Sequence, residues 1–182
     1  MNITANQIVD FWFSEPVSRL WFNSTAAFDE QLRRDYFAVY TAAMHDRFSD
    51  WQDTALGVLA LAIIFDQFPL NMFRGKPEAF ASEARAVAVA RHAIDSKLDQ
   101  QLEDRQKVFL YMPFMHSESL TDQDLSVALF EAAGLKENLR FAKHHRDIVR
   151  RFGRFPHRNA ILGRESRPEE IAYLASDEAF TG

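Results

Sequence analysis

Apolar residues recur at intervals of three and four along most of this chain, which is the spacing that places side chains on one face of a helix. The clearest case is residues 24–48, where the apolar face reads Phe28, Leu32, Tyr36, Val39, Tyr40, Ala43 and Phe48. Residues 54–68 are apolar nearly all round, as in a helix at the centre of a core. We find no sustained apolar–polar alternation, so the pattern predicts an all-α protein.

Prolines and glycines mark the expected ends of these helices. Pro69 predicts a loop ending at Gly75, because proline cannot continue a helix interior, and Pro113 is expected to end a helix likewise. Thr121 with Asp124 resembles a capping box. Further helices are expected over residues 77–96, 101–114, 122–133 and 135–152, and from residue 168. Seven or eight helices with short connections favour antiparallel neighbours, which could stack in pairs as a divergent solenoid.

Length and composition predict a single domain over residues 1–182. The chain has no cysteine, so disulfides, thiolate zinc sites and cysteine nucleophiles are excluded. The start MNITANQIVDFWF lacks the features of a secretory signal. The longest apolar run, 11 residues at 55–65, is shorter than the roughly 20 residues that span a membrane. We therefore expect a soluble, cytoplasmic protein without a membrane partner.

The net charge of −5 conceals a basic segment. Residues 140–167 hold nine Lys and Arg against two acids, a net charge of +7 that leaves −12 for the rest of the chain. The overall negative charge argues against nucleic acid as a partner, although phenylalanines lie among these arginines. The basic charge is local and points to a small anion.

The densest candidate site is the sequence HHRDIVRRFGRFPHRNAILGR at 144–164, because guanidinium groups and the N–H groups of glycine turns hold anions. His145 falls on the apolar stripe of the helix ending at Phe152, so we expect it to be buried. It is then either a core histidine or an acid/base group. Arg146 and Arg150 share a different face, for which a solvated charged surface is the alternative.

After Gly153 the chain is expected to form a loop on which polar side chains can converge. The candidate ligand-binding residues there are Arg154, His157, Arg158, Asn159 and Arg164. The alternative is that the arginines pair with carboxylates and stabilise the fold.

Asp66 is a second candidate, at the end of the central helix. A buried carboxylate is costly unless it is paired and hydrogen-bonded. Arg74 or an arginine of residues 140–167 would supply the partner and make Asp66 either a structural latch or a base held by a cation.

His116 and Glu118 form a third candidate, because they follow the helix that Pro113 is expected to end. With His145 or His157 they would make a nitrogen and oxygen ligand set for a metal. No spacing here is diagnostic of a metal, and GxGxxG, GxxxxGK[ST] and GxSxG are absent. The sequence therefore predicts neither a metal nor a cofactor.

Several of these segments resemble a known family. FDQFPLNMFRG, FLYMPFMHSESLTDQDLSVALF and HRDIVRRFGRFPHRNAILGRESRPEE, with VDFWF near the start, are similar to the bacterial domain of unknown function nine-two-four. The likeness runs from about Ile8 to Tyr173. It implies a fold similar to tetratricopeptide repeats, with stacked helical pairs and a concave side, and it implies no particular activity. The matching residues are Asp66, Gln67, Phe68, Pro69, Asn71, Phe73, Arg74, Gly75, His116, Ser117, Glu118, His145, Arg146, Arg154, Pro156, His157, Arg158, Asn159, Gly163 and Arg164.

The chain departs from the family pattern at four positions. Leu70 stands where the family usually has Arg, which leaves Arg74 and the later segment to bind any anion. Ser119 replaces an Asp. Lys76 and Arg167 stand where the family has Thr before Pro, which removes two helix N-caps worth about 1 kcal/mol each.

Three functions are compatible with these residues. In the first, a cleft binds a small phosphate or carboxylate, with His116, His145, His157, Asp66 and Glu118 as acid/base candidates. Its ligand-binding residues would be Arg74, Arg146, Arg154, Arg158, Asn159 and Arg164. In the second, a helical-repeat module holds an acidic or C-terminal peptide. In the third, the charges satisfy one another and are purely structural. The first is favoured, while substrate, oligomeric state and enzyme activity stay unassigned.

Overall fold

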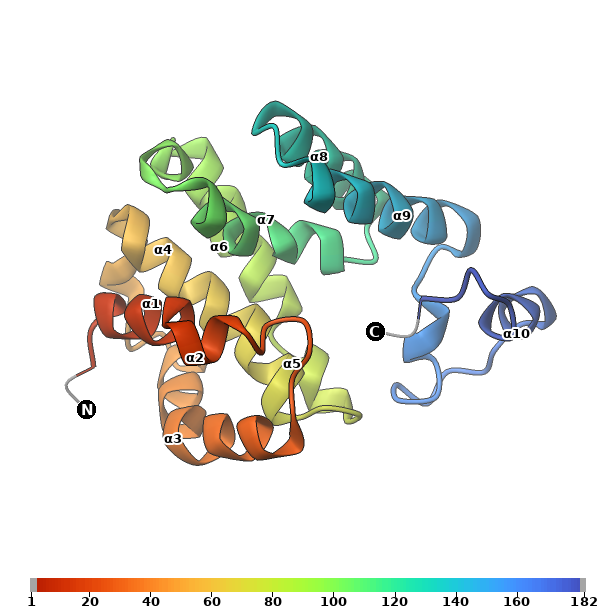
Figure 1. Ribbon diagram of the computed structural model, residues 1–182, viewed down its shortest axis with the longest axis horizontal. Coiled ribbons are helices and arrows are strands. Elements are labelled where there is room, and N and C mark those ends of the chain that lie inside the picture. The colour runs from red at the N-terminus through yellow and green to blue at the C-terminus, as the bar shows by residue number, and fades with distance from the viewer. Residues whose placement is uncertain (1–2, 181–182) are drawn as a thin grey trace. The chain divides into compact units, whose positions relative to one another are not determined.

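The computed structural model describes residues 3–180, and all regular structure in that range is helical, without a β-strand (Figure 1). This confirms the all-α prediction. The chain divides into two compact units. Unit 1 comprises Met1–Arg74 and Glu78–Pro113, and unit 2 comprises Gly75–Pro77 and Phe114–Gly182. Each unit is described by itself below, and one domain over residues 1–182 stays a prediction.

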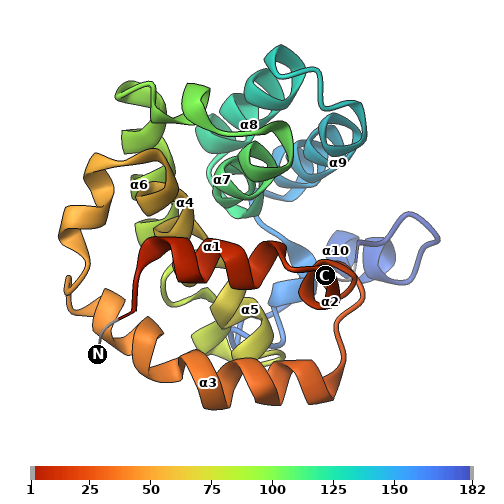
Figure 2. The same cartoon turned by 60° about the vertical axis from the view of Figure 1, so that its left-hand side comes forward.

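Unit 1 is arranged around α4, whose apolar surface needs cover on every side. Its helices are α1 (Ala5–Phe13), α2 (Glu15–Ser18), α3 (Ala26–Met44), α4 (Ala55–Ala62), α5 (Phe68–Met72), α6 (Glu83–Asp95) and the first part of α7 (Asp104–His116). Both α1 and α6 pack against α4, and α3 packs against α5 (Figure 2). Burial of α4 confirms the central helix expected from residues 54–68.

The largest fully buried side chains in the core of unit 1 are aromatic rings. The Trp12 ring lies 5.9 Å from the Phe68 ring and 5.7 Å from the Phe109 ring, between centroids, and all three side chains are fully buried. Rings of this size dominate the apolar area that folding removes from water. Trp12 lies on α1, a helix opened by a Thr4–Gln7 capping box.

The prediction of a loop after Pro69 is wrong. α4, the π-helical turn Ile63–Gln67 and α5 follow one another without a break and form one helical rod that continues to Met72. Residues Ile63–Gln67 form a π-helical turn, in which the N–H of Phe68 donates to the carbonyl of Ile63. Proline at position 69 has no N–H for the carbonyl of Phe65. The hydroxyl of Ser82, fully buried, donates to that carbonyl at 2.6 Å instead. A distant hydroxyl therefore allows the proline within the rod.

The stretch Ala55–Met72 is long and apolar enough to cross a membrane by length and composition, but 89% of it is buried inside the structure. The helical stretch is thus longer than the 11-residue apolar run considered in the sequence, and a buried core helix of a soluble protein passes the same test. The cellular location stays a prediction.

Unit 2 contains the end of α7, α8 (Leu120–Ala132), α9 (Lys136–Phe152), a 3-10 turn at Pro156–Arg158 and α10 (Pro168–Leu174). α8 and α9 lie side by side in both views (Figures 1 and 2). α9 ends where expected, at Gly153, whose φ of 73° is the left-handed conformation that glycine adopts without strain. Tetratricopeptide-like stacking of helical pairs stays a prediction.

Two boundaries in this part of the chain differ from the prediction. α7 continues through Pro113 to His116, because burial of Phe109, Phe114 and Met115 outweighs one lost backbone hydrogen bond. The capping box expected at Thr121 does not form, since α8 begins at Leu120, two residues earlier than expected, with Ser119 as its N-cap.

Candidate functional site

The turn after α7 is fixed by the buried amide of Gln123. Its Nε2 donates to the carbonyls of Met115 and Ser117, both at 2.7 Å, which satisfies acceptors that the helix end leaves open. The hydroxyl of Ser117 donates to Asp122 at 2.8 Å and accepts from the N–H of Ser119. Glu118, at the centre of this turn, is thereby held in one position.

Glu118 joins this turn to the segment after α9. Its Oε1 accepts from the N–H of Phe155 at 2.7 Å, and both its oxygens accept from Arg164 at 2.7 and 2.9 Å. Burial alone would raise the pKa of Glu118, but the Arg164 guanidinium and the Phe155 amide outweigh it and lower the pKa. Arg164 and Glu118 thus form a two-bond clamp that is already closed.

A second carboxylate, Glu170, binds two arginines. Arg154 donates to both of its oxygens, at 2.7 and 2.8 Å, and Arg167 donates from its side chain at 2.9 Å and from its backbone N–H at 2.7 Å. Asn159 adds a bond at 3.2 Å. The Arg154 guanidinium, with Arg167, holds the pKa of Glu170 well below its usual range although the side chain is fully buried. Arg167 stands at the N-cap of α10, where the family has Thr. Glu170 stabilises this helix start by accepting the bond from the Arg167 backbone N–H.

Arg158 is the buried arginine of this group, with 5% of its surface exposed. Its Nη2 donates to the carbonyl of His116 at 2.8 Å. Its guanidinium carbon lies 4.6 Å from the centre of the Phe155 ring, within cation–π range. The positive charge therefore rests on an aromatic face beside the end of α7.

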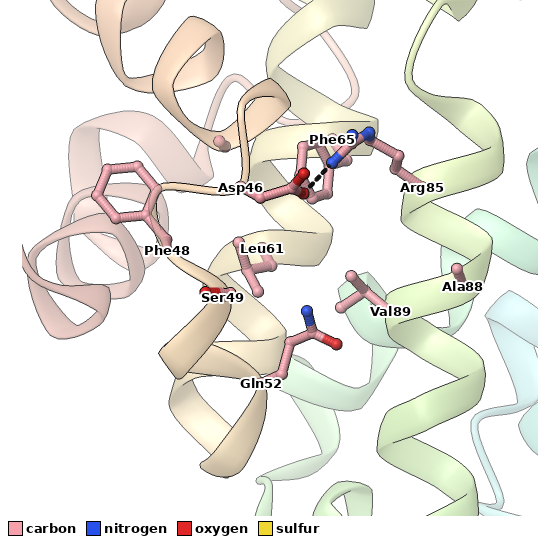
Figure 3. Close-up of a pocket in the computed structure, with 10 residues that line it drawn as sticks. Asp46, Phe48, Ser49, Gln52, Leu61, Phe65, Arg85, Ala88 and Val89 are labelled. Carbon is pink, nitrogen blue, oxygen red and sulfur yellow. Dashed lines mark hydrogen bonds and ion pairs between the residues drawn. The ribbon is translucent and has the colours of Figure 1, made fainter.

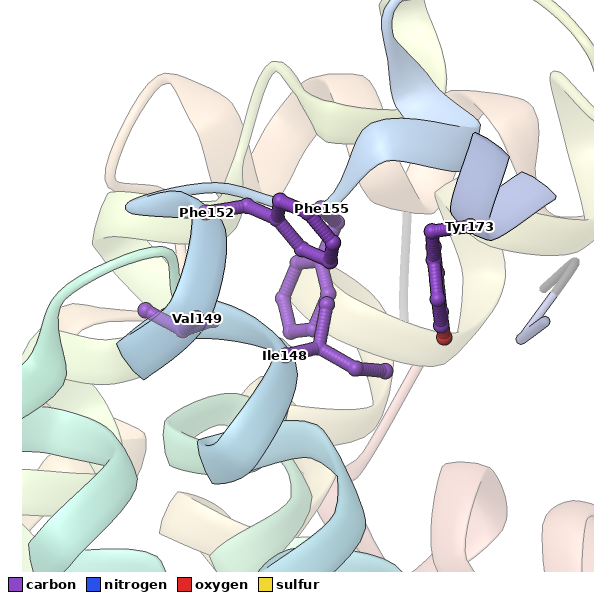
Figure 4. Packing of buried hydrophobic residues seen from close by; sticks show 5 residues of the cluster. All are labelled: Ile148, Val149, Phe152, Phe155 and Tyr173. Carbon is purple, nitrogen blue, oxygen red and sulfur yellow. The ribbon is translucent and has the colours of Figure 1, made fainter. Parts of the chain in front are cut away.

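Two imidazoles surround the same phenylalanine. Phe155 belongs to the apolar cluster of α9 and α10, with Ile148, Val149, Phe152 and Tyr173 (Figure 4). The His145 and His157 rings each lie 5.6 Å from the Phe155 ring, and they lie 4.4 and 5.0 Å from the Phe180 ring. His145 is 4% exposed, as its place on the apolar stripe predicted, and its Nδ1 lies 2.8 Å from the carbonyl of Phe141.

Both imidazoles are neutral at pH 7. Burial, then the neighbouring His116, lowers the pKa of His145 to about 3. Burial and then the Arg158 guanidinium lower the pKa of His157 to about 4. A neutral imidazole has one N–H donor and one nitrogen that accepts a proton, so either ring can act as a base. His157 is the less buried of the two.

Arg146 and Arg150 lie on the charged face of α9. Both approach the same carboxylate oxygen of Asp124, at 3.8 and 3.3 Å, and both lie within 4 Å of Asp147. Their shared face was expected from the spacing of four. Ion pairs of this kind are typical of a solvated charged surface, which is the alternative that the sequence left open for Arg146 and Arg150.

Asp66 and Arg74 belong to unit 1. Asp66 is 5% exposed, lies in the π-helical turn and accepts a bond from Gln67 Nε2 at 2.5 Å. Arg74 donates to Asp29 at 2.7 and 3.3 Å and to Asn71 at 3.0 Å. Arg74 was considered from the sequence as a partner for Asp66. In the structure, the carboxylate that Arg74 contacts is that of Asp29.

Unit 2 thus brings together His116, Glu118, His145, Arg154, His157, Arg158, Asn159 and Arg164. Within residues 3–180, no three His, Asp or Glu side chains are placed to hold a metal ion. Sequence reasoning missed Glu170, Gln123 and Phe180. The signal for Glu170 is its place three residues after Arg167, which is the N3 position of a capping box at the start of α10. No local signal marks Phe180.

Comparison with known proteins places the chain in context. The sequence model described as bacterial protein of unknown function (DUF924) matches residues 8–178. A solved structure of a protein of unknown function from Agrobacterium tumefaciens is 40% identical, with a TM-score of 0.89. The alignment covers 94% of this chain and 96% of that one. The search of proteins with curated descriptions gives no match.

Proposed function

This chain belongs to the DUF924 family of bacterial proteins of unknown function, and from its own geometry we propose that unit 2 binds a small anion, a phosphate or a carboxylate. The site is the surface beside His157 and Arg158. The observation that carries the proposal is a guanidinium fixed on the Phe155 ring next to a partly exposed, neutral imidazole. A cation held in a poorly hydrated place interacts strongly with an anion, and the imidazole N–H adds a directed bond.

The remaining arginines narrow the proposal. Arg154 and Arg164 already hold Glu170 and Glu118 in two-bond clamps, so their contribution is to fix the loop that carries His157 and Arg158. Arg146 and Arg150 share Asp124 and lie on the charged face of α9. The proposed site is therefore centred on His157, the partly exposed imidazole, with Arg158 next to it on the Phe155 ring.

If the bound ligand also reacts, His157 is the side chain that would accept a proton. Its pKa of about 4 leaves the ring in the basic form at pH 7, and it is more accessible than His145. The adjacent Arg158 would stabilise negative charge that develops on the ligand. A cytoplasmic setting is part of the proposal and rests on the sequence alone.

Thermal unfolding in the presence of ligands tests the proposal. Inorganic phosphate, succinate and an acidic peptide would each be added to the wild type, to His157→Ala and to His45→Ala. His45 is an exposed histidine of unit 1, which makes it the matched control. A ligand at about 100 times its dissociation constant stabilises by about 2.7 kcal/mol.

We expect phosphate or succinate to raise the melting temperature of the wild type and of His45→Ala but not of His157→Ala. A shift with the peptide alone would favour the peptide-binding alternative. No shift with any of the three would leave the arginine clamps with a purely structural role.

A further inference from the structure

Unit 1 contains a hollow that is separate from the site just described. Its volume is about 150 Å³, and it lies between the end of α3, the 3-10 turn Ser49–Asp53, α4 and α6 (Figure 3). Its walls are mainly apolar and include Ala43, Phe48, Leu61, Phe65 and Val89. A cavity of this size with walls of this kind accommodates about one six-membered carbon ring.

An ion pair stands beside the hollow. Arg85 Nη1 lies 2.6 Å from Asp46 Oδ1, and the Arg85 guanidinium carbon lies 5.8 Å from the centre of the Phe65 ring that lines the wall. The Asp46 side chain is 71% exposed and that of Arg85 is 39% exposed. The cation therefore lies nearer the apolar wall, and its counterion faces the solvent. Gln52 supplies a further polar group on the lining (Figure 3).

From this arrangement we propose that the hollow binds a small carboxylate with one apolar ring or branched chain. The apolar part would lie against Leu61, Phe65 and Val89, and the ligand carboxylate would replace Asp46 as the partner of Arg85. The exchange is favourable because exposed ion pairs contribute little to stability, and the displaced Asp46 carboxylate is rehydrated at once. The net gain is the apolar surface that the ligand buries.

The charge on the ligand distinguishes this proposal from binding of any apolar molecule of the same size in the hollow. A neutral molecule of the same size would gain the apolar contact alone and would leave the Asp46–Arg85 pair intact. Benzoate and benzyl alcohol are suitable probes, because they share a ring and differ in charge. For a ligand with about nine non-hydrogen atoms, we expect a benzoate dissociation constant on the order of 1 mM.

Two charge variants should change benzoate binding in opposite directions. Arg85→Gln removes the cation and should weaken binding about tenfold. Asp46→Asn removes the competing carboxylate and should strengthen binding about threefold. Asparagine also adopts the positive φ of 57° found at position 46, so the backbone is retained. Benzyl alcohol should bind more weakly than benzoate and respond little to either variant.

The location is tested with a matched pair on α6. Ala88 lines the hollow and is exposed at its edge, whereas Ala84 is equally exposed and does not line it. In a titration followed by ¹H NMR, Ala88→Trp should abolish benzoate binding and Ala84→Trp should leave it unchanged. The proposal is overturned if benzoate fails to bind the wild type, if both charge variants shift affinity in the same direction, or if the two tryptophan variants behave alike. Phosphate binding at His157 is independent of every one of these results.

Discussion

Around α4 in unit 1 the largest fully buried side chains are aromatic rings, whereas between α9 and α10 in unit 2 a carboxylate, Glu170, is buried just as completely. The rings need only shape complementarity and distance from water. Glu170 needs two arginines, an asparagine and a backbone N–H in definite positions. The comparison suggests that unit 1 tolerates small displacements and that unit 2 does not, because a partly satisfied buried network is costly. The variants below test that difference.

The largest expected effect is the loss of a ring in unit 1. Phe68→Ala should lower the free energy of unfolding by about 3–5 kcal/mol, because it empties a site surrounded by Phe11, Trp12 and Tyr36. Urea unfolding followed by circular dichroism measures it. Phe22→Ala is the control, since that ring is 74% exposed, and should cost less than about 1 kcal/mol. Equal losses would contradict the ring-based core.

Next in size is the loss of the buried carboxylate in unit 2. Glu170→Leu leaves the Arg154 and Arg167 guanidinium groups without their partner and should cost about 3 kcal/mol in the same measurement. Adding Arg154→Met to this variant should restore part of the stability. Glu169→Leu, the half-exposed neighbour, should have little effect. If the two glutamate variants were equally stable, the network would not hold unit 2 together.

The third effect in size is the dependence of the free energy of unfolding on pH, expressed per pH unit. Below pH 6.5 an unfolded histidine binds a proton, while His145 and His157, with pKa values of about 3 and 4, stay neutral in the fold. The unfolded state then holds more protons, so acidification from pH 6.5 toward 4 destabilises the protein by about 1.4 kcal/mol per unit for each histidine. His157→Gln should flatten the profile measured between pH 7 and 5. An unchanged slope in His157→Gln would contradict a neutral His157 ring in the fold.

The smallest effect is expected for the ion pair beside the hollow of unit 1. Arg85→Gln should change the melting temperature by less than about 3 °C, because both partners of this pair are substantially exposed. Differential scanning calorimetry measures this change. A large drop would show that the pair stabilises the fold and would argue against its exchange with a ligand.

The features that were predicted correctly are those that depend on nearby residues. The limits of α9 follow from a stripe of spacing three and four ended by Gly153, and the burial of His145 follows from its place on that stripe. The errors depend on distant partners. Pro69 continues the rod because Ser82, 17 positions from the carbonyl of Phe65, takes the place of a missing N–H. Likewise the pairing of Arg154 with Glu170 spans 16 positions and depends on the path of the intervening loop.

The π-helical turn at Ile63–Gln67 also determines how many residues the central rod can hold. Such a turn is equivalent to one additional residue within an α-helix. Because the wide turn accommodates the additional residue, deleting one of these five residues would allow a regular α-helical turn and leave the residues beyond it on nearly the same faces of the rod. Phe68 and Asn71 would then keep their directions although their numbers had changed. When homologous sequences are aligned, a one-residue gap here is therefore compatible with an unchanged α5.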